Sequence, residues 1–264
     1  MDGRRCEYLA GTLQQAATRI QLCGALAATI DGRRIDPDLP GRQGRLLFGY
    51  LVANRTRPTS RAVLIDALWP VDAPATAETT LSGILSRLRG ALGRDAIEGK
   101  SQLRIVLPGD AWIDVEVAVD AIHRAESAVA LGDWARAWAP ARIALHAATR
   151  EFMQGFEAPW IGERRRYLHA LRLSALECVA AAGIGMDGPE LASTERSART
   201  LIELEPYRES GYRLLMQALE RRDNVAEALR VYDGLRRLLR DELGVAPGAA
   251  VQTLHMQLLS RNGA

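Results

Sequence analysis

The chain has 264 residues, which is long for a single hydrophobic core and typical of two domains. Its composition, 48% hydrophobic and 25% charged, excludes a disordered or collagen-like chain, and no run of about 18 apolar residues predicts a membrane span. The net charge is only +2, but residues 41–94 carry eight arginines against three acids, a local excess that can attract a polyanion.

The first predicted element is a small sheet. Residues 19–36 read RIQLCGALAATIDGRRID and alternate in part between apolar and polar side chains. The pair Asp31-Gly32 favours a tight hairpin turn, so we expect two short strands here. Residues 1–18, which precede this pattern, are expected to form an N-terminal extension.

Two short helices are predicted next. Apolar residues recur at helical spacing in residues 41–56 and again in residues 60–69. Ser60 stands where the second helix begins and is a natural N-cap. The sequence PVDAPA, residues 70–75, then predicts a loop whose two prolines limit its conformations.

The third helix is predicted around TLSGILSRLRGAL, residues 80–92. Leu85, Leu88 and Leu92 fall within about 40 degrees of Leu81 on a helical wheel, and the four leucines form an apolar stripe that faces the core. The opposite face is small, hydroxylated and cationic, which lets a helix lie close to DNA while guanidinium groups reach bases or phosphates. That face comprises Thr79, Gly83, Ser86, Arg87, Gly90 and Arg94.

A β-hairpin is predicted after this helix. Turn residues Glu98-Gly99-Lys100 and Pro108-Gly109-Asp110 flank a short β-rich run, Leu103 to Leu107. The order of strands, three helices and a terminal hairpin is that of a winged helix-turn-helix, in which the third helix lies in the major groove. We expect this α+β domain to span residues 19–114.

The remainder, residues 117–260, predicts an all-α domain of helical repeats, so that the whole chain is mainly α. The turns Gly132-Asp133 and Asp223-Asn224 separate helical runs of similar length, as repeat architectures require. Three stretches resemble the tetratricopeptide pattern of two short antiparallel helices: 126–145, 189–206 and 216–239.

Several classes of chemistry are not encoded. Cys6, Cys23 and Cys178 are scattered with no CxxC pair, which argues against a disulfide framework and a metal site. No phosphate-binding GxxxxGK[ST] loop occurs, and no motif places Glu203 and Glu205 in a pocket with a nucleophile. The first 20 residues lack the apolar centre of a secretory signal. We therefore expect a cytoplasmic protein that is not an enzyme and needs no cofactor.

Several of these stretches resemble those of a known family. TTLSGILSRLRGALG, residues 79–93, resembles the recognition helix of OmpR-type winged helices as it occurs in SARP-type activators, the antibiotic regulatory proteins of GC-rich bacteria. Residues 40–70 resemble the two preceding helices. Residues 158–177 and 227–255 are similar to signatures of the bacterial transcriptional activation domain. The resemblance covers roughly residues 19–260.

The resemblance implies a DNA-binding activator that binds promoter direct repeats as side-by-side protomers, without a membrane, and recruits RNA polymerase. The loop between the second and third helices touches polymerase in OmpR-type domains; here it is Pro70, Val71, Asp72, Ala73, Pro74 and Ala75. Arg87 has the best position for a base edge, whereas Arg61, Arg94 and Lys100 are expected to bind phosphates. The full predicted DNA-binding set is Arg61, Thr79, Ser82, Gly83, Ser86, Arg87, Arg89, Arg94 and Lys100.

The chain departs from the family at the wing, where Ser101-Gln102 replace the usual Gly-Tyr pair. One alternative therefore stays open, a tetratricopeptide-type interaction scaffold whose winged helix does not bind DNA. Duplex binding that weakens steeply with salt separates the two functions, because only a DNA-binding domain releases counterions from phosphates.

Overall fold

The structure is a computed structural model that describes residues 17–262. The predicted N-terminal extension lies almost wholly outside these residues, and so does Cys6. The chain forms two compact units. One contains the chain up to Val117 together with Arg150–Leu168, and the other contains Ala118–Thr149 and the chain from His169 onward.

A four-stranded sheet opens the first unit. Its strand order is β3-β2-β1-β7, with β1 antiparallel to β2 and parallel to β7. The predicted turn is present, since Asp31 and Gly32 both have positive φ angles, 49° and 78°, as a two-residue hairpin needs. The strands are β1 Arg19–Gln21, β2 Ala27–Ile30, β3 Arg33–Arg34 and β7 Trp112–Ile113.

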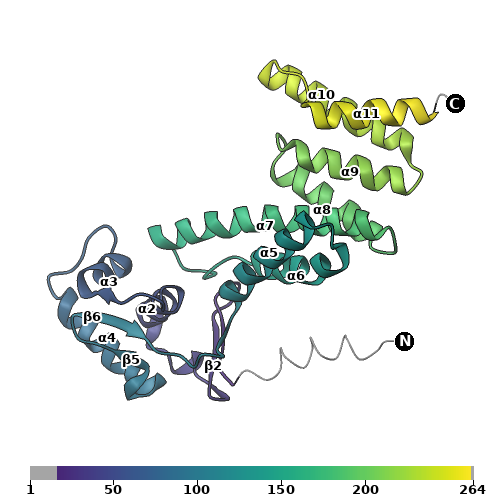
Figure 1. The fold of residues 1–264 in the computed structure, drawn as a ribbon. Helices are drawn as coiled ribbons and strands as arrows, with labels where there is room; N and C mark the ends of the chain where they lie inside the picture. Colours follow the sequence, from purple (N-terminus) through teal and green to yellow (C-terminus); the bar gives the residue numbers. More distant parts are fainter. Residues whose placement is uncertain (1–16, 263–264) are drawn as a thin grey trace, which may run out of the picture. The chain divides into compact units, whose positions relative to one another are not determined.

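Three helices follow, as the apolar spacing predicts (Figure 1). The Ser60 hydroxyl caps the second of them by accepting a hydrogen bond from the backbone N–H of Val63 at 3.4 Å. The third helix begins three residues earlier than expected, and its leucine stripe is buried as predicted. The helices are α2 Gly41–Ala53, α3 Arg61–Leu68 and α4 Ala77–Leu92, with short 3-10 turns η1 Asp36–Asp38 and η2 Arg94–Ala96.

The predicted hairpin is formed by β5 Ile97–Glu98 and β6 Gln102–Ile105. The strand β4, Thr59–Ser60, pairs with the other edge of β6, so the hairpin is joined to the start of α3. Gly99 turns the hairpin with φ +90°, and an added Cβ would lie 1.8 Å from the carbonyl oxygen of Gln102. Only glycine fits this turn.

Residues 150–168 return to the winged helix from far along the chain. The backbone N–H of Met153 donates to the Leu22 carbonyl at 2.7 Å, and Phe152 forms a β-bridge with Cys23. The Trp160 ring packs edge-on against Tyr50 of α2, with ring centroids 5.1 Å apart. The first unit is therefore completed by a segment that follows the first repeat helices in sequence.

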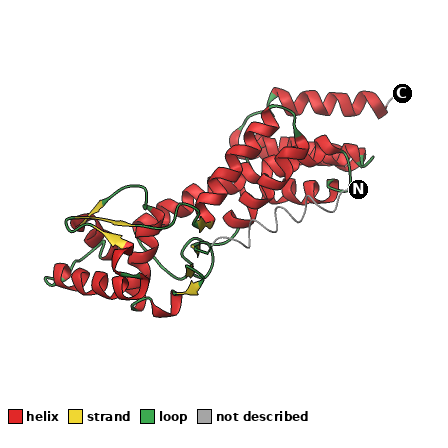
Figure 2. Ribbon diagram, turned by 60° about the horizontal axis from the view of Figure 1, so that its bottom comes forward, coloured by secondary structure: helices red, strands yellow, loops and turns green. Residues whose placement is uncertain are grey.

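The second unit is a stack of helices, and all strands among residues 17–262 belong to the first unit (Figure 2). The predicted turns are confirmed by positive φ angles at Gly132 and Asp223. The helix α9 packs against α8, α10 and α11. The helices are α5 Asp114–Ala130, α6 Trp134–Ala148, α7 Pro159–Met186, α8 Leu191–Leu204, α9 Glu209–Arg221, α10 Val225–Leu243 and α11 Ala249–Asn262; α5 and α7 begin in the first unit.

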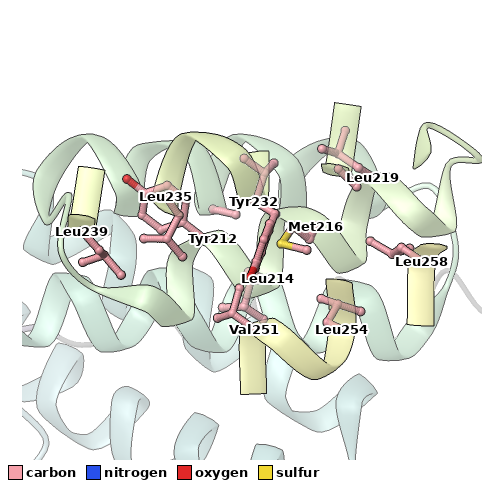
Figure 3. Packing of buried hydrophobic residues seen from close by; sticks show 14 residues of the cluster. Tyr212, Leu214, Met216, Leu219, Tyr232, Leu235, Leu239, Val251, Leu254 and Leu258 are labelled. Atoms are coloured by element: carbon pink, nitrogen blue, oxygen red, sulfur yellow. The ribbon is translucent and has the colours of Figure 1, made fainter. Parts of the chain in front are cut away.

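The C-terminal helices share one apolar core, which Figure 3 shows from close by. Within it the Tyr232 ring stacks on His255, with ring centroids 3.8 Å apart and an angle of 6° between the planes. The labelled core residues are Tyr212, Leu214, Met216, Leu219, Tyr232, Leu235, Leu239, Val251, Leu254 and Leu258.

The long helix α7 contains an 18-residue window with a mean hydropathy of 1.3, enough by length and composition to cross a membrane. More than half of that window, 56%, is buried inside the protein. Leu173 and Leu176, for example, pack with Leu201 of α8. The apolar character of α7 is therefore explained by its place in the core.

Candidate nucleic-acid interface

The helix α4 separates its apolar and polar residues as the sequence predicts. Leu81, Leu85 and Leu88 are at most 1% exposed. The outer face contains only one acid, Glu78, and one exposed arginine, Arg87. The exposed residues of α4 are Glu78, Thr79, Ser82, Gly83, Ser86, Arg87 and Gly90.

Two glycines, Gly83 and Gly90, lie on this exposed face. A Cβ added at either position would meet nothing within 4 Å. Neither glycine has a positive φ angle, and each costs roughly 0.5–1 kcal/mol relative to alanine inside a helix. The packing of the protein does not require these glycines. Their effect is that no side chain projects from the outer face of α4 at these two positions.

The start of α3 is bonded to the start of α4 through Arg61. Its guanidinium Nε donates to Glu78 Oε2 at 2.8 Å, and its Nη2 donates to the Ser82 hydroxyl at 2.7 Å. The Ser82 hydroxyl donates in turn to the carbonyl oxygen of Glu78 at 2.9 Å. Arg61 is thus occupied inside the domain, a fact that its position in the sequence did not reveal.

Arg89 connects α4 to the hairpin. Its guanidinium donates to the carbonyl oxygens of Ile97 at 3.2 Å and Gly99 at 3.3 Å. Arg33 similarly donates from Nη2 to the Ala91 carbonyl at 2.7 Å, near the end of α4. These two arginines hold the helix against the hairpin and the first sheet. Figure 1 shows α4 beside β5.

The remaining predicted cations point to solvent. Arg94 and Lys100 are exposed and form no ion pair with any residue between 17 and 262. Arg87 makes one bond, from Nε to the Gly83 carbonyl at 3.3 Å, which leaves the end of its guanidinium available. Arg57 is also exposed and unpaired in the described part of the chain, but the sequence reasoning overlooked it. The arginine-rich run NRTRPTSR, residues 54–61, is the sequence signal that could have identified it.

The loop predicted to touch polymerase is exposed along its whole length, residues 70–75, with Val71 97% exposed. The carbonyl oxygen of Pro74 accepts from the N–H of Ala77, so the loop ends directly in the first turn of α4. Trp69 is half-buried at the end of α3. The loop is therefore a free surface anchored at both ends.

The two cysteines in the described part of the chain, Cys23 and Cys178, are buried free thiols. Burial raises the pKa of each to about 12, so both thiols are protonated at physiological pH and are poor nucleophiles. Across residues 17–262, no three His, Cys, Asp or Glu side chains are grouped as metal ligands.

Comparison with known proteins identifies a family and several relatives that match this chain. The family described as "Bacterial transcriptional activator domain" matches residues 113–259. The regulatory protein AfsR of Streptomyces coelicolor is 32% identical over 264 residues, which cover all of this chain and 26% of AfsR. The regulatory protein DnrI of Streptomyces peucetius is 26% identical over 258 residues, which cover 91% of this chain and 92% of DnrI.

A third relative is the transcriptional regulatory protein EmbR of Mycobacterium tuberculosis, 29% identical over 252 residues, or 90% of this chain and 62% of EmbR. The solved structure of EmbR in complex with a low-affinity phosphopeptide matches 94% of this chain with a TM-score of 0.79 at 23% identity, and so shows the same fold. The chain spans less than two thirds of both AfsR and EmbR. The winged helix, the helical repeats and these matches together show that the chain belongs to the bacterial transcriptional activator domain family, among the SARP-type transcriptional regulators.

Proposed function

We propose that this chain is a sequence-specific DNA-binding regulator that binds direct repeats in promoters and activates transcription by recruiting RNA polymerase. The observation that carries the proposal is the outer face of α4, which is small and hydroxylated and carries the exposed Arg87, with Arg94 just beyond its end. The packing of the protein does not require the two glycines of this face, since a Cβ at either position would meet no other atom within 4 Å. A helix that enters a major groove can approach the bases more closely when its outer side chains are small.

The proposal assigns different tasks to the cations around α4. Arg87, near the middle of the exposed face, reaches a base edge, because guanidinium groups commonly read guanine. Arg94 at the end of α4 and Lys100 at the tip of the hairpin neutralise phosphates on either side of the groove. The exposure of all three, and the lack of a side-chain partner for Arg94 and Lys100 within residues 17–262, support these roles.

Polymerase contact is assigned to the loop of residues 70–75, which leads from α3 into α4. When α4 lies in the groove, this loop is expected to point away from the DNA, where a second protein can meet it. Its complete exposure supports the assignment. Protomers bound to adjacent repeats lie side by side in the cytoplasm, and neither a cofactor nor a membrane takes part.

The test is binding of the full chain to promoter duplexes over a range of salt concentrations. We expect log affinity to fall linearly with log salt, and Arg94→Ala and Lys100→Ala each to reduce that slope by about one unit. Both variants should weaken specific and random DNA equally. Arg136→Ala, on an exposed residue of α6 paired with Asp133 at 3.8 Å, is a matched control outside the interface.

If the chain shows no salt-dependent duplex binding, the winged helix is not a DNA reader. The chain is then the tetratricopeptide-type scaffold that remained as the alternative. A loss confined to the cognate site in either variant would show that Arg94 or Lys100 reads sequence instead of binding phosphate.

A further inference from the structure

The exposed face of α4 contains a single carboxylate, that of Glu78. Its side chain is 62% exposed and lies in the first turn of the helix. An acid on a surface that meets phosphates is repelled by them, so the residue weakens binding unless it makes a specific contact. The position of Glu78 thus raises the question of what it contacts.

Glu78 is held in one orientation by α3. Arg61 donates to its Oε2 at 2.8 Å and to its backbone carbonyl at 3.2 Å, and Ser82 donates to the same carbonyl at 2.9 Å. The Arg61 side chain is only 25% exposed, which limits its freedom to leave this arrangement. These bonds use Oε2 and leave Oε1 of Glu78 as a free acceptor at the helix surface.

The first turn of a recognition helix is the part whose side chains contact base edges in the major groove. A carboxylate can only accept hydrogen bonds, and the base edge that offers a donor without requiring one in return is the N4 amino group of cytosine. Adenine also offers an amino group, but its neighbouring N7 is an acceptor that repels a carboxylate. A fixed acceptor at this point therefore favours cytosine.

We infer that Glu78 reads a cytosine in the operator and that Arg61 is its positioning residue, not a phosphate ligand. The inference rests on the proposed function, because it assumes that α4 lies in a major groove. It also changes the role expected for Arg61 from the sequence, since its guanidinium is already committed to Glu78 and Ser82.

The test is selection of preferred sites from a randomised duplex library by the full chain and by Glu78→Gln. The glutamine amide keeps its oxygen as the acceptor for Arg61 and presents its NH2, a donor, where the carboxylate presented an acceptor, so the N4 amino group of cytosine is no longer matched. We expect the cytosine preference at one operator position to be lost by roughly fivefold or more, in favour of bases that offer an acceptor in the major groove. All other positions should keep their preference.

Glu98→Gln is the matched control, because Glu98 is an exposed acid of the hairpin that also pairs with an arginine, Arg104, at 3.0 Å. It removes the same charge from the same domain and should raise affinity for all duplexes equally without changing any preferred base. Arg61→Ala should weaken the cytosine preference at the position that Glu78→Gln changes. A uniform loss of affinity with that preference intact would restore the phosphate role.

The outcomes separate the two proposals. If the unmodified chain selects no motif, the proposed function itself fails. If it selects a motif that Glu78→Gln leaves unchanged at every position, DNA binding stands and the reading of cytosine by Glu78 is overturned. If the Glu78→Gln variant does not fold, Glu78→Asp is the second variant, because it keeps the charge on a shorter side chain. It is expected to weaken the cytosine preference without introducing a preference for another base. An unchanged cytosine preference in Glu78→Asp overturns the inference.

Discussion

Arg87 and Arg89 stand two residues apart on α4 and occupy different environments. The periodicity of the helix turns Arg87 to solvent and Arg89 toward the hairpin, where its guanidinium bonds to two carbonyl oxygens. Two arginines of one short motif therefore have distinct physical roles, one open to a partner and one internal. The distinction can be measured.

Arg87→Ala should cost about 1–3 kcal/mol of specific binding free energy and relax one operator position, because it removes the base contact that we propose for this residue. Its melting temperature should stay unchanged, since the residue makes only a local bond to Gly83. Arg89→Ala should instead lower the free energy of unfolding by about 1 kcal/mol, as the partly buried carbonyl of Ile97 and the exposed carbonyl of Gly99 lose a charged donor. DNA titration and thermal denaturation of both variants check these two expectations. An equal decrease of the melting temperature in Arg87→Ala and Arg89→Ala would contradict the assignment.

At the scale of elements, α4 and the hairpin use glycine for opposite reasons. Gly99 is required by the backbone, which turns at φ +90° with the Gln102 carbonyl in the space of a Cβ. Gly83 and Gly90 sit in ordinary helical geometry with free space around them. The hairpin glycine serves folding, and we propose that the helix glycines serve the approach of DNA.

Gly83→Ala and Gly90→Ala should each raise the free energy of unfolding by about 0.5–1 kcal/mol, because alanine is the better helix former. Gly83→Ala should nevertheless weaken operator binding, since Gly83 lies on the exposed face of α4 that we propose enters the groove. Urea denaturation and DNA titration of the same samples measure both effects. Gly99→Ala is the control and should destabilise the domain; unchanged DNA affinity in Gly83→Ala would show that the small surface has no role in binding.

The loop between α3 and α4 permits a separation of binding from activation. Replacing Val71 and Asp72 with Gly and Ser should leave operator affinity within a factor of about 3, because neither side chain packs against the domain. Promoter output in a reconstituted transcription assay should fall if the loop meets polymerase. Full output from this variant would transfer the polymerase contact to another part of the chain, residues 117–260 first.

At the scale of the whole molecule, the winged-helix unit depends on residues from distant parts of the sequence. The buried carboxylate of Asp114 accepts backbone hydrogen bonds from Leu22 at 2.9 Å and Cys23 at 2.8 Å. Arg150 lies 3.7 Å from the same carboxylate and so brings in the return segment. One fully buried acid thus connects the first sheet, the start of α5 and residues 150–168.

Asp114→Asn should lower the free energy of unfolding by about 1–3 kcal/mol, because an amide nitrogen replaces one of two acceptors and leaves a buried N–H unpaired. Chemical denaturation of the full chain measures this loss. Asp110→Asn, on an exposed acid a few residues earlier, should change stability by less than about 0.5 kcal/mol. Similar stability in the two variants would show that Asp114 does not connect these segments energetically.

The sequence by itself determined the elements and their inner faces. The leucine spacing of α4, the Asp31-Gly32 turn and the Ser60 cap are local signals, since each depends on residues within a few positions of one another. Gly132 and Asp223 mark the repeat turns for the same reason. Local periodicity was therefore sufficient to predict a winged helix followed by helical repeats.

Only the tertiary structure decided which arginines are free. Whether Arg61 binds Glu78, or Arg89 the carbonyls of the hairpin, depends on how separate elements are packed, and no periodicity within one element encodes it. The return of residues 150–168 to the first sheet is likewise a long-range pairing, made by backbone groups that carry no side-chain signal. The sequence thus contains the candidate cations, and the packing of α3, α4 and the hairpin determines which of them remain available to DNA.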